Sequence, residues 1–196
     1  MTNIKNICVF ASSCEDIGEA YYKDARDLGL LIGHNGYNIV YGGSRKGLMY
    51  ACAGAVKEAG GNICAVIPEI FINMGFGNPE DCAEFIVTTG MRERKAMLDE
   101  KSDAVIAIAG GYGTLEELSE MIVQKQLGYN EKPIVILNTN GFYDKLLEFF
   151  DEITEKRFAG STPKSIIYVA NTPEDAINYI NNYVPAEFMS KFEKIK

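Results

Sequence analysis

The sequence has few of the residues from which metal centres and disulfide frameworks are built. It contains one histidine, His34, and no two cysteines in a C-x-x-C arrangement. The cysteines are odd in number and widely spaced: Cys8, Cys14, Cys52, Cys64 and Cys82. This pattern argues against a zinc site and against structural disulfides, and it is typical of a reducing compartment. We therefore expect no bound metal, and we expect His34 to have no catalytic role.

Long apolar runs are also missing. The sequence has no stretch of about 18 apolar residues, so no membrane-spanning helix is expected. The apolar run at residues 7–11 is short and meets two serines, which does not fit a secretory signal. Together with the cysteine pattern, these features predict a cytoplasmic protein.

The sequence lacks an excess of positive charge. Its 19 lysines and arginines are outnumbered by 27 acidic residues, and the formal net charge is −8 at pH 7. Nucleic acids and anionic membranes would repel such a chain, so neither is an expected partner. A small anion can still bind where backbone N–H groups and one or two cations make a site locally positive.

Short runs rich in valine and isoleucine alternate with longer helical stretches along the chain. The expected strands are residues 7–10, 37–41, 62–67, 84–87, 104–109, 134–137 and 166–169. The expected helices are residues 18–33, 47–59, 91–101, 114–126, 143–156 and 173–182. Nearly continuous apolar strands are typical of parallel sheets buried on both faces. The alternation predicts an α/β fold with a Rossmann-like, doubly wound, mostly parallel sheet in a single domain.

Two parts of the chain fall outside this alternation. Residues 70–83 form the longest irregular stretch and follow the carboxyl end of an expected strand. They fit either a lid over a ligand site or an ordinary surface loop. We expect the domain to span residues 1–182 and residues 183–196 to form a C-terminal appendage.

The strongest local signal is the glycine cluster 110–113, which joins an apolar strand to an amphipathic helix. Glycines let the backbone turn tightly and bring N–H groups close to an anion, and the helix N-terminus adds positive potential. A dinucleotide-binding fingerprint is excluded because Glu116 stands where its last glycine is required. A P-loop at residues 42–47 is excluded because Leu48 replaces the lysine. The cluster therefore predicts a phosphate site that follows neither of these patterns.

Three further segments border this predicted site, and each has two interpretations. Residues 41–49 form a second strand–glycine–helix junction, which is either a second ligand loop or a tight turn. Thr114 and Glu117 fit a capping box, with Glu117 reaching back, but Glu117 could instead be a functional carboxylate. Arg94 and Lys95 could bind a phosphate or ribose, or could lie in a solvated helix start.

These motifs together resemble the Lonely Guy family of cytokinin riboside 5′-monophosphate phosphoribohydrolases, once mislabelled as lysine decarboxylases. The resemblance rests on M-x-x-R-K at residues 91–95 and on G-G-x-G-T-x-x-E at residues 110–117. It extends over most of the chain. The sequence departs from the family pattern at Ala109, where the motif has proline, and at Ser44, Tyr50 and residues 11–13.

The resemblance implies hydrolysis of the N-glycosidic bond of a purine nucleoside 5′-monophosphate, such as AMP or a cytokinin riboside monophosphate. The products would be the free base and ribose 5-phosphate. Arg94 and Glu117 would be the catalytic pair. The substrate-binding residues would be Ser13, Gly43, Lys95, Gly110, Gly111, Tyr112, Gly113, Thr114 and Glu116. The resemblance further implies a Rossmann-like homodimer that needs no metal or organic cofactor.

Two other functions compete with this one. A non-catalytic carrier of a nucleotide-like ligand, such as the molybdenum cofactor, would have the same fold, although the retained Arg94 and Glu117 argue against it. Lysine decarboxylation would require pyridoxal phosphate and a lysine that forms a Schiff base. Tight binding without turnover would favour the carrier.

Overall fold

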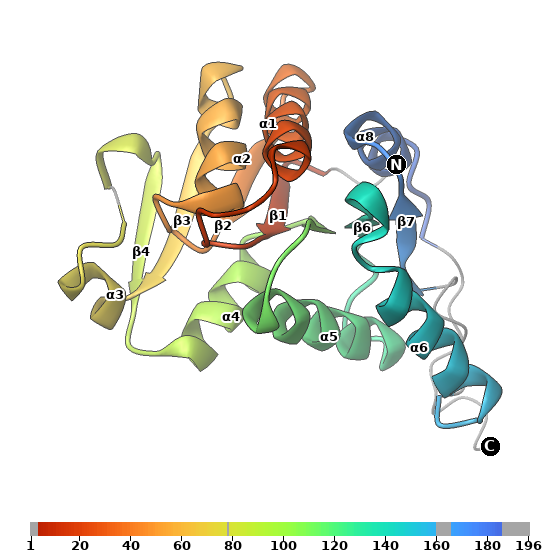
Figure 1. Ribbon diagram of the computed structural model, residues 1–196. Helices are drawn as coiled ribbons and strands as arrows, with labels where there is room; N and C mark the ends of the chain where they lie inside the picture. The colour runs from red at the N-terminus through yellow and green to blue at the C-terminus, as the bar shows by residue number, and fades with distance from the viewer. Residues whose placement is uncertain (1–3, 78, 160–165, 186–196) are drawn as a thin grey trace.

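A parallel sheet of seven strands runs through the computed structural model, which describes residues 4–77, 79–159 and 166–185 (Figure 1). The strands are β1 (Asn6–Phe10), β2 (Asn38–Tyr41), β3 (Ile63–Pro68), β4 (Glu84–Thr88), β5 (Ala104–Ala107), β6 (Ile134–Leu137) and β7 (Tyr168–Ala170). Their order is β4-β3-β2-β1-β5-β6-β7, and every neighbouring pair is parallel. The prediction of a doubly wound α/β sheet is confirmed.

The chain builds the sheet outward from β1 in two directions. It adds β2, β3 and β4 on one side, then returns to place β5, β6 and β7 on the other. The loops that follow β1 and β5 therefore leave the sheet in opposite directions at its carboxyl edge. Open α/β sheets bind ligands at this point of reversal.

Helices cover both faces of the sheet. They are α1 (Glu19–His34), α2 (Gly47–Glu58), α4 (Met91–Glu100), α5 (Tyr112–Gln126), α6 (Asp144–Glu155) and α8 (Pro173–Asn181), with a short α3 (Glu69–Asn73). Single 3-10 turns lie at η1 (Pro79–Asp81) and η2 (Thr139–Gly141). Figure 1 shows α1, α2 and α8 on one face and α4, α5 and α6 on the other. None of the helices in the described ranges is long and apolar enough to cross a membrane.

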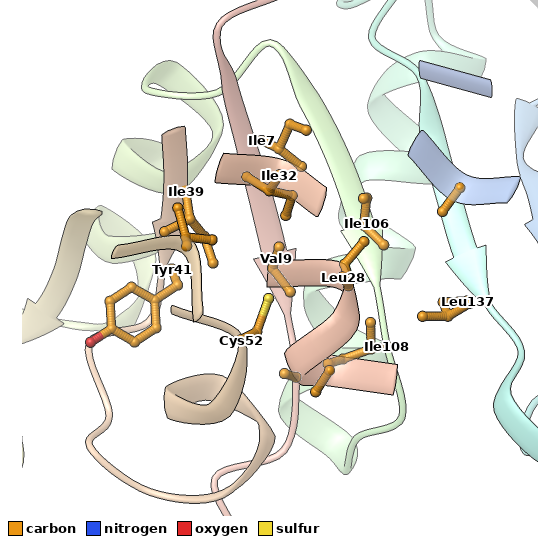
Figure 2. Packing of buried hydrophobic residues seen from close by; sticks show 14 of the residues in the cluster. Ile7, Val9, Leu28, Ile32, Ile39, Tyr41, Cys52, Ile106, Ile108 and Leu137 are labelled. Carbon is orange, nitrogen blue, oxygen red and sulfur yellow. The ribbon is translucent and has the colours of Figure 1, made fainter. Parts of the chain in front are cut away.

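Alternate strand residues enter two separate hydrophobic clusters. In β1, Ile7 and Val9 belong to the cluster on the α1, α2 and α8 face, whereas Cys8 and Phe10 belong to the opposite cluster. Figure 2 shows the first cluster, in which Leu28 of α1 lies over the strands. Because both faces of the central strands are buried, their residues must be apolar at nearly every position.

The structure differs from the sequence-based expectations at some boundaries. Helix α5 begins at Tyr112 rather than Thr114, because Gly111 takes the extended backbone that precedes a helix. Strand β5 ends at Ala107, two residues before the expected end, and β7 occupies 168–170 rather than 166–169.

The two parts outside the alternation are described to different extents. The stretch at 70–83 is only partly irregular, because α3 extends into it and η1 lies within it. Whether it acts as a lid stays a prediction. Most of the expected C-terminal appendage, residues 186–196, lies outside the described residues.

Candidate active site

The loops that follow β1, β2 and β5 meet at the carboxyl edge of the sheet. The Ser12 N–H donates to the Ala109 carbonyl oxygen at 3.2 Å, which joins the β1 loop to the β5 loop. The Met49 N–H, in the first turn of α2, donates to the Ser12 carbonyl oxygen at 3.1 Å. Gly47 lets α2 start this close, since a Cβ there would lie 2.4 Å from the Cys14 carbonyl oxygen. The three loops therefore form one connected surface.

Arg94 and Glu117 form a buried ion pair at this edge. Arg94 lies on α4 and Glu117 on α5, and Nη1 of the arginine is 2.6 Å from Oε1 of the glutamate. Their side chains are 8% and 6% exposed. The arginine Nε also donates to the Val66 carbonyl oxygen of β3 at 3.2 Å. The guanidinium thus links α4, α5 and the sheet in a fixed position.

The position of Arg94 also explains why the residue directly after β2, Gly42, is a glycine. A Cβ added to Gly42 would lie 2.0 Å from Nη2 of Arg94, so the guanidinium and the backbone at Gly42 lie in direct contact. The sequence placed Gly42 in the 41–49 junction, as part of a second ligand loop or a tight turn, but gave no sign of its contact with Arg94. A larger residue there would displace Arg94.

Glu117 is a perturbed carboxyl group. Burial raises its pKa above the ordinary value of 4.5, and the nearby Arg94 opposes this shift. The capping-box interpretation of this segment was wrong, because α5 starts two residues before Thr114 and Glu117 pairs with Arg94 instead of a backbone N–H. A desolvated carboxylate held beside one cation can respond strongly to a positive charge that develops nearby.

The first turn of α5 has the features of an anion site. Gly111 precedes the helix, no side chain among the described residues caps the first N–H groups, and the first turn contains no acidic residue. Tyr112 is 93% exposed, and a Cβ at Gly113 would meet nothing within 4 Å. The uncapped N–H groups and the helix dipole favour a phosphate here.

Thr114 lies underneath this turn. Its side chain is 2% exposed, and its Oγ1 atom is buried without a hydrogen-bond partner among the described residues. A Cβ at Gly110 would lie 2.1 Å from this oxygen, so only glycine fits against it. A buried hydroxyl without a partner is unusual in a folded protein, which makes Thr114 a candidate ligand contact.

Lys95 is held by two carboxylates. Its Nζ atom lies 2.7 Å from Oε1 of Glu116 and 2.7 Å from Oε2 of Glu120, and hydrogen bonds to these groups raise its pKa. The two predicted substrate-binding residues Lys95 and Glu116 therefore lie together and form an ion pair with each other. Sequence reasoning missed Glu120, which the i,i+4 spacing from Glu116 on α5 could have indicated.

The remaining predicted site residues lie on the same edge. Ser13 is exposed in the β1 loop, and Gly43 is buried in the β2 loop with a φ of 78°. This φ lies in the left-handed region, which glycine adopts without a steric cost. Ser44, one of the departures from the family pattern, is 7% exposed and accepts from the Lys46 N–H at 3.2 Å.

A doubly wound parallel sheet with a glycine-rich helix start at its point of reversal defines a Rossmann-like protein. The family model described as "Possible lysine decarboxylase" matches residues 49–180. The chain belongs to this family, and its resemblance to the Lonely Guy proteins is confirmed.

Curated relatives cover nearly the whole chain. It is 36% identical over 184 residues to the cytokinin riboside 5′-monophosphate phosphoribohydrolase LOG3 of Arabidopsis thaliana, covering 94% of this chain and 85% of that protein. It is equally similar to LOG of Oryza sativa subsp. japonica, with 36% identity and coverage of 94% and 76%.

Solved structures share the fold at lower identity. The molybdenum cofactor carrier protein of Chlamydomonas reinhardtii superimposes with a TM-score of 0.70 at 24% identity, covering 91% of this chain and 97% of that chain. The molybdenum cofactor binding protein of Rippkaea orientalis superimposes with a TM-score of 0.69 at 24% identity, covering 92% and 98%. At this identity the likeness establishes the fold alone.

Proposed function

We propose that this protein is an N-glycosyl hydrolase that cleaves a purine nucleoside 5′-monophosphate, such as AMP or its N6-modified derivatives. The products are the free base and ribose 5-phosphate. The observation that carries the proposal is the buried Arg94–Glu117 pair beside the uncapped start of α5. The curated relatives, which are named for this reaction, support it.

The proposed reaction divides the site into two parts. The phosphate binds the N–H groups at residues 110–114 and holds the nucleotide, while C1′ of the ribose faces Glu117. Breaking the C1′–N9 bond sends the electron pair to the base and leaves positive charge on the ribose ring, as in glycoside hydrolysis. The Glu117 carboxylate stabilises this charge and takes a proton from the water that attacks C1′, while the departing base gains a proton from solvent. Arg94 holds the carboxylate in place.

This mechanism predicts an acid limb in the pH profile. The rate constant kcat/KM for AMP should fall as the pH drops through the pKa of Glu117, because only the ionised carboxylate stabilises the ribose cation. Burial raises this pKa, so the midpoint should lie above 4.5. A profile of kcat/KM between about pH 4 and pH 9 measures it. A midpoint at or below the ordinary glutamate value would contradict the assignment.

Thr114→Val should weaken AMP binding by about tenfold without lowering stability. Valine has nearly the same shape, and the hydroxyl that it removes has no partner in the described protein. A hydrogen bond from that hydroxyl to a charged phosphate would contribute ~1.5–3 kcal/mol, which is at least about tenfold in affinity. Calorimetric titration with AMP and urea unfolding measure the two effects separately.

A matched control is Thr172→Val. The Thr172 side chain accepts from the Asp175 N–H at 3.2 Å and caps α8, so its loss should cost ~1 kcal/mol of stability and leave AMP binding unchanged. If Thr114→Val binds AMP as tightly as the wild type does, the Thr114 hydroxyl does not contact the phosphate.

Decarboxylation of lysine fits the site less well. A lysine that forms a Schiff base must reach its neutral form, which requires a lowered pKa. Hydrogen bonds to carboxylates raise the pKa of both Lys95 and Lys46, the latter through Glu15. Both amino groups are therefore held in the charged form.

The remaining features of the proposed enzyme concern its assembly and surroundings. It acts as a cytoplasmic homodimer on a small molecule, without nucleic acid, membrane, metal or organic cofactor. Support comes from the net charge of −8 and from the family resemblance. Light scattering of the purified protein measures the oligomeric state.

The experiment that tests the function compares four compounds. AMP and N6-isopentenyladenosine monophosphate should release free base, while adenosine and isopentenyladenosine should react far more slowly because they lack the phosphate that positions the ribose. Equal rates with and without the phosphate would contradict the claim that phosphate binding at residues 110–114 positions the ribose for cleavage.

A further inference from the structure

Tyr143 lies between η2 and α6, outside the site described above. It contacts the backbone just after the carboxyl end of β5. Its side chain is 1% exposed, and its hydroxyl donates to the Ile108 carbonyl oxygen at 2.8 Å. Ile108 stands two residues before the glycine cluster. We propose that Tyr143 is a positioning residue that orients the phosphate-binding loop, an inference that rests on the proposed phosphate site.

The backbone and the ring of Tyr143 are themselves held in a fixed place. The Tyr143 backbone N–H donates to Oδ1 of Asn138 at 2.7 Å, and Nδ2 of Asn138 donates to Oδ1 of Asp144 at 2.7 Å. The ring of Phe142 packs edge-on against the Tyr143 ring at 4.9 Å between centroids. The ring is therefore fixed at its base and its side, and burial raises the pKa of the hydroxyl so that it stays a donor.

Two successive carbonyl groups before the glycines are anchored in this way. Tyr143 holds the Ile108 oxygen, and the Ser12 N–H holds the Ala109 oxygen at 3.2 Å. Because each peptide group is planar and trans, fixing a carbonyl oxygen also fixes the direction of the N–H on the other side. Tyr143 thus orients the N–H of Ala109, which leads into the loop, and Ser12 orients the N–H of Gly110, the first of the proposed phosphate-binding groups, before any anion arrives.

The loss of this anchor should affect phosphorylated ligands in particular. Without the hydroxyl, the buried Ile108 carbonyl has lost its partner, and the peptide gains freedom to rotate. The loop must then be ordered again when a phosphate binds, and this cost appears as weaker binding. A residue that only stabilises the fold would lower the unfolding temperature and leave the affinity of the folded protein unchanged.

The test is calorimetric titration of wild-type protein and Tyr143→Phe with ribose 5-phosphate and with adenosine. We expect the Kd for ribose 5-phosphate to rise roughly tenfold in the variant, and the Kd for adenosine to stay within about twofold. Tyr37→Phe is the matched control. It also loses one tyrosine hydroxyl bond, 2.6 Å to Oδ1 of Asn181, at the amino end of β2, and should bind ribose 5-phosphate as the wild type does.

Two unnatural residues at position 143 complete the test. 4-Aminophenylalanine restores an N–H donor at the same place and should return the Kd to the wild-type value. If Tyr143→Phe does not fold, 4-fluorophenylalanine fills the volume of the hydroxyl without donating and should show the same loss of affinity.

The possible results separate this inference from the proposed function. Wild-type affinity for ribose 5-phosphate in the folded donor-free variants would overturn the positioning role, even if their unfolding temperature falls. No binding of ribose 5-phosphate by the wild type would overturn both the phosphate site and this inference. Binding without release of base from AMP would contradict the catalytic proposal and leave the role of Tyr143 standing.

Discussion

Glu117→Gln is expected to lower kcat for AMP hydrolysis by about 10³-fold while the protein stays folded. Glutamine has the same shape, and its amide oxygen can still accept from Nη1 of Arg94, where the glutamate oxygen lies at 2.6 Å. It cannot carry the negative charge that stabilises the ribose cation or take a proton from water. Groups in these roles typically contribute ~10²–10⁴-fold. Steady-state rates of adenine release measure the loss.

The control for this variant is a second glutamate that pairs with a cation away from the site. Glu84, at the start of β4, accepts from Nζ of Lys101 at 2.5 Å. Glu84→Gln removes a comparable charge and should retain wild-type kcat. If Glu117→Gln stays within about threefold of the wild type, the carboxylate is not part of the chemistry.

Arg94→Met should lower both activity and stability. It leaves Glu117 buried without its cation, and breaking a buried ion pair in this way costs about 3 kcal/mol or more. Without the arginine, burial raises the pKa of Glu117 further, against only the weaker opposing effect of Lys95. A carboxyl group whose pKa is raised on folding contributes stability at low pH and loses it as the pH rises. The destabilisation should therefore be larger at pH 8 than at pH 5.

Urea unfolding of Arg94→Met at both pH values measures this dependence. Arg26→Met is the matched control, because Arg26 pairs with Glu58 at 2.7 Å on the surface, where such a pair contributes less than ~1 kcal/mol. The double variant with Glu117→Gln should be less destabilised than the sum of the single variants, because neither partner is left as an unpaired charge. A cost that is equal at both pH values would contradict the role of Glu117 as the unpaired group.

Most of the fold could be predicted because its signals are local. The buried strands are apolar at nearly every position, and glycines mark several helix ends, so element order followed from the residues alone. Helix α3 was missed because five residues carry too little periodicity to be recognised. The start of α5 was misplaced because Thr114 and Glu117 match a capping box, and only the tertiary contact between Glu117 and Arg94 decides against it.

The candidate site could be predicted only in part. The glycine cluster predicted an anion site because its backbone N–H groups can face an anion. The pairing of Arg94 with Glu117 had no such local signal, because the two residues are 23 positions apart on different helices. No local pattern says that they meet, and the expectation came from the family resemblance. The contacts of Gly42 and Tyr143 were missed for the same reason, since they involve distant parts of the chain, 35 residues away in the case of Tyr143.

The central claim is that this protein cleaves the glycosidic bond of a nucleoside monophosphate. The most direct measurement is chromatography of the products after AMP is incubated with wild-type protein and with Glu117→Gln. We expect adenine and ribose 5-phosphate in equal amounts with the wild type, and almost none with the variant. AMP that binds but yields no adenine, or adenosine and inorganic phosphate as products, would contradict it.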